Sequence, residues 1–252
     1  NLFVLDTKDC FVEFSELNTR VYGKSFKEVY MQGSANFSLD TDDSFINLMC
    51  IHGELRGDLG SDYNSITSEF IKSSGMDYIA LGHIHKRSDI GKVGNTFVSY
   101  PGCPEGQGFD ELGEKGVYIG EISKGVCQLQ FVPTAKRMHL AESVNVSGLS
   151  TANDIADGVV YELKQKYSAT FADNIYKITL VGSINDDTVI SVPEISSRLN
   201  DILYFAKVLD KTETATDFNA LAQEKSLKGI FVKNMLARIN DAPDDQKVLL
   251  KS

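Results

Sequence analysis

The segment DYIALGHIHKR, residues 77–87, joins an apolar run of strand-forming residues to a pair of histidines. The run ends at Gly82, and half of the chain's four histidines, His83 and His85, lie within the next three residues. In an extended segment, residues two positions apart point the same way, so both imidazoles can face one spot. Neutral imidazole is a common ligand of zinc, manganese and iron, and the segment therefore indicates a metal site.

A second apolar run ends in the same manner. FINLMCIHG, residues 45–53, stops at His52 and is typical of a strand that is buried on both faces. The intervening SITSEFIKSSG, residues 65–75, has an apolar helical stripe and a terminal glycine, which completes the strand–helix–strand order of an α/β fold. Sites in open α/β sheets lie at the carboxyl ends of strands, so we expect His52 to lie beside His83 and His85.

Other polar features near this pattern have structural interpretations. An isolated H-x-H pair is more often a surface pair, and it is the third histidine at another strand end that favours a metal site. We expect His139, in RMHLAE, to be exposed and structural. The acidic cluster Asp40, Asp42 and Asp43 lacks EF-hand spacing and predicts a turn. GCPEGQG lacks the spacing of a P-loop and predicts a tight loop near the histidines.

The composition excludes some classes of protein. No apolar run approaches the ~20 residues that a membrane helix needs, and the net charge of −10 argues against non-specific coating of nucleic acid. Residues 1–136 carry 12 Lys+Arg against 19 Asp+Glu, and residues 137–252 carry 13 against 16. The negative charge is thus concentrated in the half that contains the histidine pair. A negatively charged surface attracts divalent cations, and it can bind a phosphate substrate only if a metal ion supplies positive charge.

The four cysteines are widely spaced and form no C-x-x-C pair, which argues against a zinc ribbon or a redox motif. Cys50 and Cys127 lie in apolar runs and are expected to be buried thiols. Reduced cysteines favour a cytoplasmic location.

The pattern of elements changes after Pro133. A helix that begins near Thr151, a strand, a helix that starts at a proline and a further strand follow in about 75 residues, which suits a compact α+β appendage. We therefore expect three parts: 1–136, 137–210 and 211–252. The helix near 226–239 is expected to pack as core rather than to form a partner surface.

Four segments resemble a known family. The motifs IHG and GHIH resemble the last two motifs of the calcineurin-like metallophosphoesterase superfamily. SYPGCPEGQGFDELGEKGVYIGEI, residues 99–122, is similar to the Y-P-G-(S/C)-P…F-E…G-x-K-G signature of SbcD-type DNA-repair exonucleases, and its PGCPEG resembles the YhaO-like branch. TRVYGKSF, residues 19–26, is similar to the same branch. The resemblance is specific over about residues 19–122.

This resemblance implies a fold and a cofactor. The fold would be α/β: the C-terminal portion of a four-layer αββα metallophosphoesterase sandwich, followed by a smaller α+β capping domain. The cofactor would be two divalent metal ions, with manganese favoured. His52 and His83 would bind one ion and His85 the other.

The family's D-x-H, G-D-x-x-D and G-N-H-D motifs, which include its proposed proton donor, do not occur in this sequence. We therefore assign no catalytic residue here. We expect the rest of the site to lie upstream of Asn1 and the 252-residue chain alone to be inactive.

The resemblance also implies a function, a DNA exonuclease or endonuclease that acts in DNA repair. Lys86 and Arg87 would be its substrate-binding residues, although adjacent side chains diverge and at most one should face phosphate. The implied partners are DNA, a coiled-coil ATPase of the SbcC type and a second copy of the chain, with no membrane. One alternative is a phosphatase or phosphodiesterase on other substrates, but the 167 residues beyond His85 exceed what a compact phosphoesterase needs. The other alternative is a non-catalytic cap or scaffold that binds a partner protein.

Overall fold

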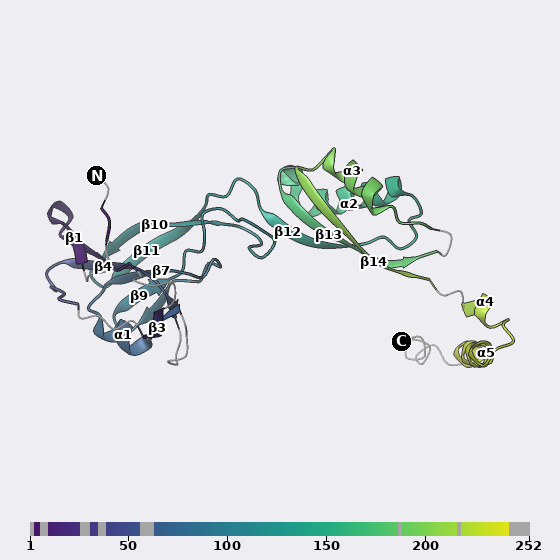
Figure 1. Cartoon of the computed structure of the whole chain (residues 1–252), viewed down its shortest axis with the longest axis horizontal. Helices are drawn as coiled ribbons and strands as arrows, with labels where there is room; N and C mark the ends of the chain where they lie inside the picture. The colour runs from purple at the N-terminus through teal and green to yellow at the C-terminus, as the bar shows by residue number, and fades with distance from the viewer. Residues whose placement is uncertain are drawn as a thin grey trace. The chain divides into compact units, whose positions relative to one another are not determined.

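The structure is a computed structural model of the chain (Figure 1). It describes residues 3–5, 10–25, 31–34, 39–55, 63–185, 188–215 and 218–241. Two compact units divide the chain: Asn1–Ala141 with Asp173–Ile175, and Glu142–Ala172 with Tyr176–Ser252. No helix among the described residues is long and apolar enough to cross a membrane.

A six-stranded sheet forms the main part of the first unit, in the order β1-β2-β4-β7-β9-β8. Its strands are β1 Cys10–Phe14, β2 Thr19–Gly23, β4 Ile46–His52, β7 Tyr78–Gly82, β8 Gly91–Val93 and β9 Thr96–Ser99. The four central strands β2, β4, β7 and β9 are parallel, and the edge strands β1 and β8 are antiparallel to their neighbours. The mixed α/β class expected from the sequence is thus observed. The apolar run LFVL, residues 2–5, also predicts a short strand, but residues 3–5 are not in a strand, so this prediction was wrong.

One face of this sheet carries the core of the unit. Met49 and Ile51 of β4 are buried together with Ile79 and Leu81 of β7, and the short helix α1, Ser68–Ser73, adds Ile71. Thr67 caps α1 by accepting the N–H of Phe70, so the helix begins later than the 65–75 pattern predicted.

The opposite face of β4 is exposed at Cys50 and His52. Because side chains alternate along a strand, β4 is buried on one face only, and the prediction of a strand buried on both faces was wrong. The prediction that Cys50 is a buried thiol was wrong for the same reason, and Cys127 is only half-buried.

Smaller elements complete the first unit. The sequence SKG, residues 123–125, lies between two short apolar runs and predicts a hairpin turn. β10 Gly116–Ser123 and β11 Val126–Pro133 form this antiparallel hairpin, which confirms the prediction. β3 Met31–Ser34, β6 Tyr63–Ile66 and β5 Glu54–Leu55 form a small parallel sheet, and Ser15–Leu17 is a 3-10 turn.

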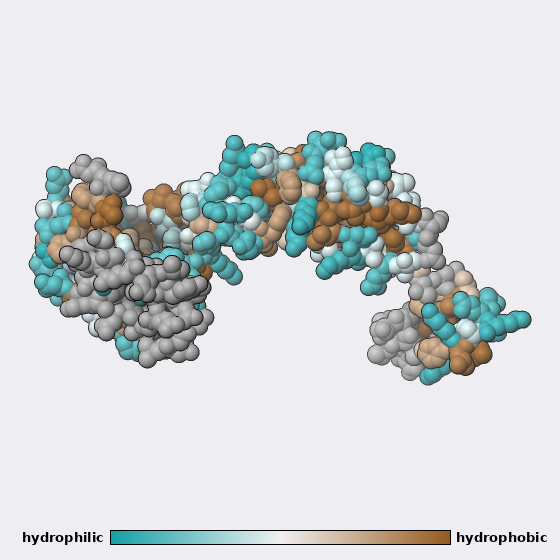
Figure 2. Space-filling view, viewed as in Figure 1, coloured by the Kyte–Doolittle hydropathy of each residue, from teal (hydrophilic) through white to brown (hydrophobic). Residues whose placement is uncertain are grey.

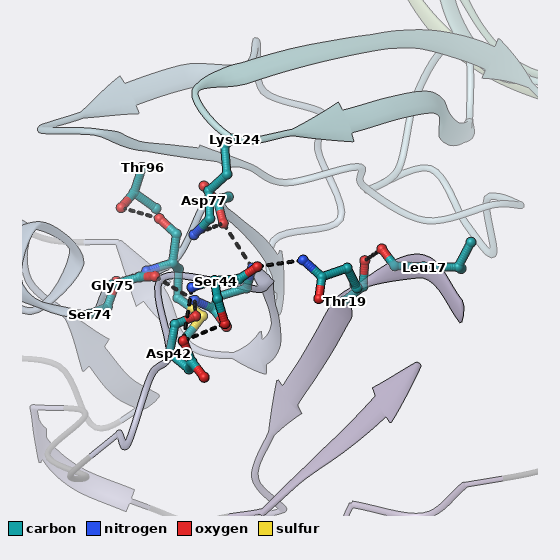
Figure 3. Close-up of polar contacts among 12 residues, drawn as sticks. Leu17, Thr19, Asp42, Ser44, Ser74, Gly75, Asp77, Thr96 and Lys124 are labelled. Carbon is teal, nitrogen blue, oxygen red and sulfur yellow. Dashed lines mark hydrogen bonds and ion pairs between the residues drawn. The ribbon is translucent and has the colours of Figure 1, made fainter. Parts of the chain in front are cut away.

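A polar network closes the amino-terminal edge of the main sheet (Figure 3). The Asp77 carboxylate accepts the Asn47 N–H at 2.8 Å and the Lys124 ammonium at 3.0 Å. The Asn47 amide donates to the carbonyls of Asp42 and Gly75, at 3.1 and 3.3 Å. These bonds join the starts of β4 and β7 to the hairpin tip.

The predicted acidic turn contributes to this edge. Asp42 and Asp43 occupy a turn that the N–H of Phe45 closes on the Asp42 carbonyl at 3.0 Å, which confirms the prediction. The Asp42 carboxylate also accepts the hydroxyl and the N–H of Ser44, and these bonds lower the pKa of Asp42.

The second unit contains helices and a three-stranded sheet in the order β12-β13-β14. Its elements are β12 His139–Asn145, α2 Ala152–Tyr167, the 3-10 turn Ser168–Thr170, β13 Ile175–Ile184, α3 Val192–Asn200, β14 Phe205–Thr214, α4 Phe218–Leu221 and α5 Leu227–Asp241. Alternate residues of β13 are fully buried, as are the apolar stripes of α2 and α3. This alternation places the core on one face of the sheet.

Two sequence expectations are wrong in this part of the chain. His139, at the start of β12, is buried rather than exposed, and its ring packs edge-on against Phe109 at 5.4 Å between centroids. Helix α5 does not pack as core. Leu227, Ile230 and Phe231 are 88%, 56% and 64% exposed, and apolar surface is visible around the helix in Figure 2.

Candidate metal centre

The carboxyl ends of β4 and β7 bring His52 and His83 together. These strands are parallel neighbours, and the last residue of β4, His52, pairs with Gly82 of β7. A Cβ at Gly82 would lie 3.3 Å from His52 Nδ1, so the glycine gives the imidazole room. The His52 and His83 ring centroids are 5.0 Å apart and the rings are tilted by 67°. The expectation that His52 and His83 meet at the carboxyl ends of neighbouring strands is therefore confirmed.

His83 lies at a strained backbone position. Its φ is +104°, in a region that L residues other than glycine rarely adopt. The chain thus leaves the strand after Gly82, and the expectation of an extended segment through His83 was wrong. Strain of this kind persists only where surrounding structure holds it, and it is concentrated at functional sites.

The third histidine, His85, interacts electrostatically with His52. Burial lowers the pKa of His52, and the nearby His83 and His85 lower it further. A lowered pKa keeps His52 neutral to more acidic pH, and the neutral imidazole is the form that binds metal. The His85 side chain is 60% exposed.

The loop after β9 holds the histidine segment in place. Gly102 has φ +82°, and a Cβ there would lie 3.0 Å from the His85 carbonyl oxygen and 3.1 Å from the Arg87 nitrogen. Only glycine fits so close to another backbone without strain. This contact confirms the prediction that GCPEGQG forms a tight loop near the histidines.

Tyr100 ties the two histidine-bearing ends together. Its hydroxyl donates to the Gly53 carbonyl at 2.9 Å and accepts the Leu55 N–H at 2.7 Å, just after His52. Its own N–H donates to the Ser88 hydroxyl at 2.9 Å, three residues after His85. The phenol is buried, and burial raises its pKa.

The two candidate phosphate-binding residues differ in their surroundings. Both Lys86 and Arg87 are exposed. The Arg87 guanidinium stacks on the Phe131 ring of β11 at 4.0 Å from the centroid. This contact gives Arg87 a structural role, so Lys86 is the better candidate of the two.

Sequence reasoning missed the residues that surround His85. Glu111 Oε1 bonds to His85 Nδ1, and its Oε2 accepts the Gln107 N–H at 2.8 Å. The bonds from His85 and Gln107 hold the pKa of Glu111 at about 2. The Cys103 thiol lies 3.6 Å from Glu111 Oε2, and the buried Lys115 ammonium donates to the His85 carbonyl at 3.0 Å. The F-E pair of the 99–122 signature was the signal that could have identified Glu111.

The donor set fits a divalent transition metal. Imidazole nitrogens suit zinc, manganese and related ions, and the His52 and His83 rings meet at the carboxyl ends of neighbouring strands. His85, Cys103 and Glu111 also have ligand atoms within 4.8 Å of one another. Three imidazoles alone are fewer ligands than two ions require.

Comparison with known proteins gives a consistent result. No family model matches the chain. Over 114 residues, the chain is 34% identical to the uncharacterized metallophosphoesterase YhaO of Bacillus subtilis (strain 168). The match covers 44% of this chain and 28% of that protein, so the chain spans just over a quarter of the relative's length. Over the matched residues, the chain is thus similar to a protein named as a metallophosphoesterase.

Proposed function

We propose that the chain forms part of a nuclease that hydrolyses phosphodiester bonds of DNA with two divalent metal ions, in the manner of SbcD-type repair enzymes. The observation that carries the proposal is the meeting of His52 and His83 at neighbouring strand ends, with His83 held at a strained φ of +104°. The similarity to a metallophosphoesterase supports the reaction class. The resemblance of residues 99–122 to the nuclease signature supports DNA as the substrate.

The roles of the residues follow from their places. His52 and His83 would hold one ion, His85 would hold the other, and Lys86 would contact the phosphate. When bound, such metal ions would supply a water of lowered pKa as the nucleophile and would stabilise the oxyanion that leaves. Manganese is the proposed metal because of the family resemblance.

We further propose that residues outside the 252-residue chain complete the ligands of both ions, because three imidazoles do not suffice. The nuclease test compares the chain with a longer protein that carries the remaining motifs. With manganese and a plasmid or oligonucleotide, the chain alone is expected to give no turnover, and the longer protein is expected to give turnover that His83→Ala abolishes. Turnover by the chain alone that His83→Ala removes would overturn the ligand argument. A longer protein that cleaves a small phosphodiester but no DNA would favour the alternative phosphodiesterase.

The four-layer sandwich is also a proposal. The exposed face of β4 carries Cys50, and a second sheet would cover this face. Cys50 should therefore react with a thiol reagent faster in the 252-residue chain than in the longer protein, with the half-buried Cys127 as internal reference. Equal reactivity of Cys50 in both would contradict a covering sheet.

A scaffold role has one observation in its favour. Helix α5 exposes Leu227, Ile230 and Phe231, so the end of the chain has apolar surface available to a partner. A capping role for the second unit, a coiled-coil ATPase partner and dimer formation remain proposals that rest on the resemblance, and a cytoplasmic location remains a proposal that rests on the cysteine pattern. If the chain still bound a partner after Leu227→Ser and Phe231→Ser, the exposed apolar surface of α5 would not be the binding site.

A further inference from the structure

The contact between Glu111 and His85 determines which ring nitrogen of His85 can bind a metal. Glu111 Oε1 lies against His85 Nδ1. An ionised carboxylate only accepts hydrogen bonds, so Nδ1 must carry the proton. In a neutral imidazole the other nitrogen, Nε2, then has the free lone pair.

Glu111 is well placed to hold the ring. Its side chain is 10% exposed, whereas that of His85 is 60% exposed, so the carboxylate is the fixed partner and the imidazole is the free end. Its Oε2 accepts the Gln107 N–H at 2.8 Å, and its own N–H donates to the Gly108 carbonyl at 3.0 Å. A Cβ at Gly106 would lie 3.2 Å from the Glu111 carbonyl oxygen, so the loop is closely packed.

The same loop also fixes the backbone of His85. The Lys115 ammonium donates to the His85 carbonyl at 3.0 Å, and the Cys103 thiol lies 3.7 Å from the same oxygen. Gly102 packs against this carbonyl as well. Residues 102–115 therefore hold His85 both by its backbone and by its ring.

We propose that Glu111 is a positioning residue for His85: it accepts the Nδ1 proton and leaves Nε2 directed to the metal. The metal part of this inference rests on the proposed function, and the tautomer part does not. Carboxylates that accept the second N–H of a ligating histidine are a recurrent feature of metal sites.

A competing arrangement would use His85, Cys103 and Glu111 themselves as ligands, because their ligand atoms lie within 4.8 Å of one another. Such an ion would take the place of the bond between Glu111 and the ring. Both Glu111 oxygens already accept hydrogen bonds, which favours the positioning role.

The first test is the tautomer of His85 in the metal-free 252-residue chain, from long-range ¹H–¹⁵N correlations at a pH where the histidines are neutral. The chain should show the Nδ1–H form at His85. Glu111→Ala should shift it towards the Nε2–H form that free imidazole prefers, and Glu111→Gln, whose amide oxygen still accepts, should largely retain Nδ1–H. Asp110→Ala, in the adjacent position, should change nothing. An Nε2–H form in the unaltered chain, or no shift in Glu111→Ala, would overturn the proposal.

The second test is cobalt(II) titration of the same variants in the longer protein that carries the remaining motifs, because the 252-residue chain alone is expected to lack part of the ligands. Glu111→Ala should weaken binding by about 10–100-fold, the usual effect of removing such a support, and Asp110→Ala should not. Cys103→Ser should bind as the unaltered chain does, with no thiolate-to-cobalt charge-transfer band in either. A band that Cys103→Ser removes would overturn the positioning role in favour of the competing ligand set. If no cobalt binds but the tautomer is as expected, the metal centre of the proposed function fails and the positioning of His85 by Glu111 stands.

Discussion

The two edges of the main sheet both carry polar side chains at the ends of β4 and β7, but they differ in how those side chains are used. At the amino edge, the Asp77 carboxylate accepts the Asn47 N–H and pairs with the Lys124 ammonium (Figure 3). At the carboxyl edge, His52 is exposed and His83 is strained. The density of polar groups is thus a poor guide to function, whereas exposed ligating atoms on strained backbone are a better one.

A pocket also lies beside the polar network at the amino edge. A cavity of 360 Å³ lies there, and its lining includes Lys72, Lys92 and Lys124. Lys124 is paired with Asp77 at 3.0 Å, and Lys92 lies over the Phe97 ring at 4.6 Å. Two of the three lysines thus have structural partners, so a cavity lined by charged side chains does not by itself identify a site.

The largest expected contrast is in metal binding. His83→Gly and His83→Ala should both weaken zinc or cobalt binding by more than about 100-fold, beyond the effect of losing a supporting residue. Because φ at position 83 is +104°, His83→Gly should also be more stable than His83→Ala, by about 1–2 kcal/mol. Calorimetric titration and urea unfolding measure the two effects. If both variants bound metal as tightly as the unaltered chain, His83 would not be a ligand and the carboxyl edge would not differ from the amino edge in metal binding.

A change at the amino edge should affect stability alone. Asp77→Ala leaves the Asn47 N–H without its acceptor and Lys124 without its carboxylate, at a cost of about 1.5–3 kcal/mol. The exposed Asp43→Ala should change stability by less than about 0.5 kcal/mol. Urea unfolding with parallel metal titration checks both variants, and lost metal affinity in Asp77→Ala would show that the edges are coupled.

A matched pair of glycines tests the loop that supports His85. Gly102 and Gly113 have φ +82° and +80°, but of the two only Gly102 has neighbours within 4 Å of the place that a Cβ would occupy. Gly113→Ala should cost about 1 kcal/mol through φ alone. Gly102→Ala should cost about 1–2 kcal/mol more, because its methyl group meets the backbone of the histidine segment, and should shift the His85 ring resonances. Equal effects on stability would argue that the contact with His85 is unimportant.

The smallest expected effect is a pH dependence at His52. Its folded pKa lies below the unfolded value, so the folded state binds fewer protons and stability rises with pH through the range just below ordinary imidazole titration. The stability that neutral His52 contributes is present above that range and is lost as pH falls through it. NMR titration should show a midpoint below that of free histidine. The midpoint should rise in His83→Gly yet stay low, because burial is the larger cause.

The features that could be predicted from the sequence are those that local residue patterns determine. The strands that end at His52 and Gly82, and the hairpin across residues 123–125, followed from apolar runs and turn residues. The meeting of His52 with His83 followed from the rule for parallel strand ends.

What the sequence did not predict depends on contacts between distant segments. The bond from Glu111 to His85 spans 26 residues, and no periodicity encodes it. The exposure of Cys50 and the burial of His139 depend on which face another segment covers. The φ of His83 reflects packing that overrides an extended run.

The buried phenol of Tyr100 has a consequence for thermal motion. It bonds to the segment after His52 through Gly53 and Leu55, and its backbone bonds to Ser88 beyond His85. Segments joined in this way fluctuate together, so the spacing between their imidazoles varies less than the position of either one. If these imidazoles bind an ion as proposed, the ion would find them already positioned, and most of the ordering entropy of these side chains would have been lost during folding rather than on binding.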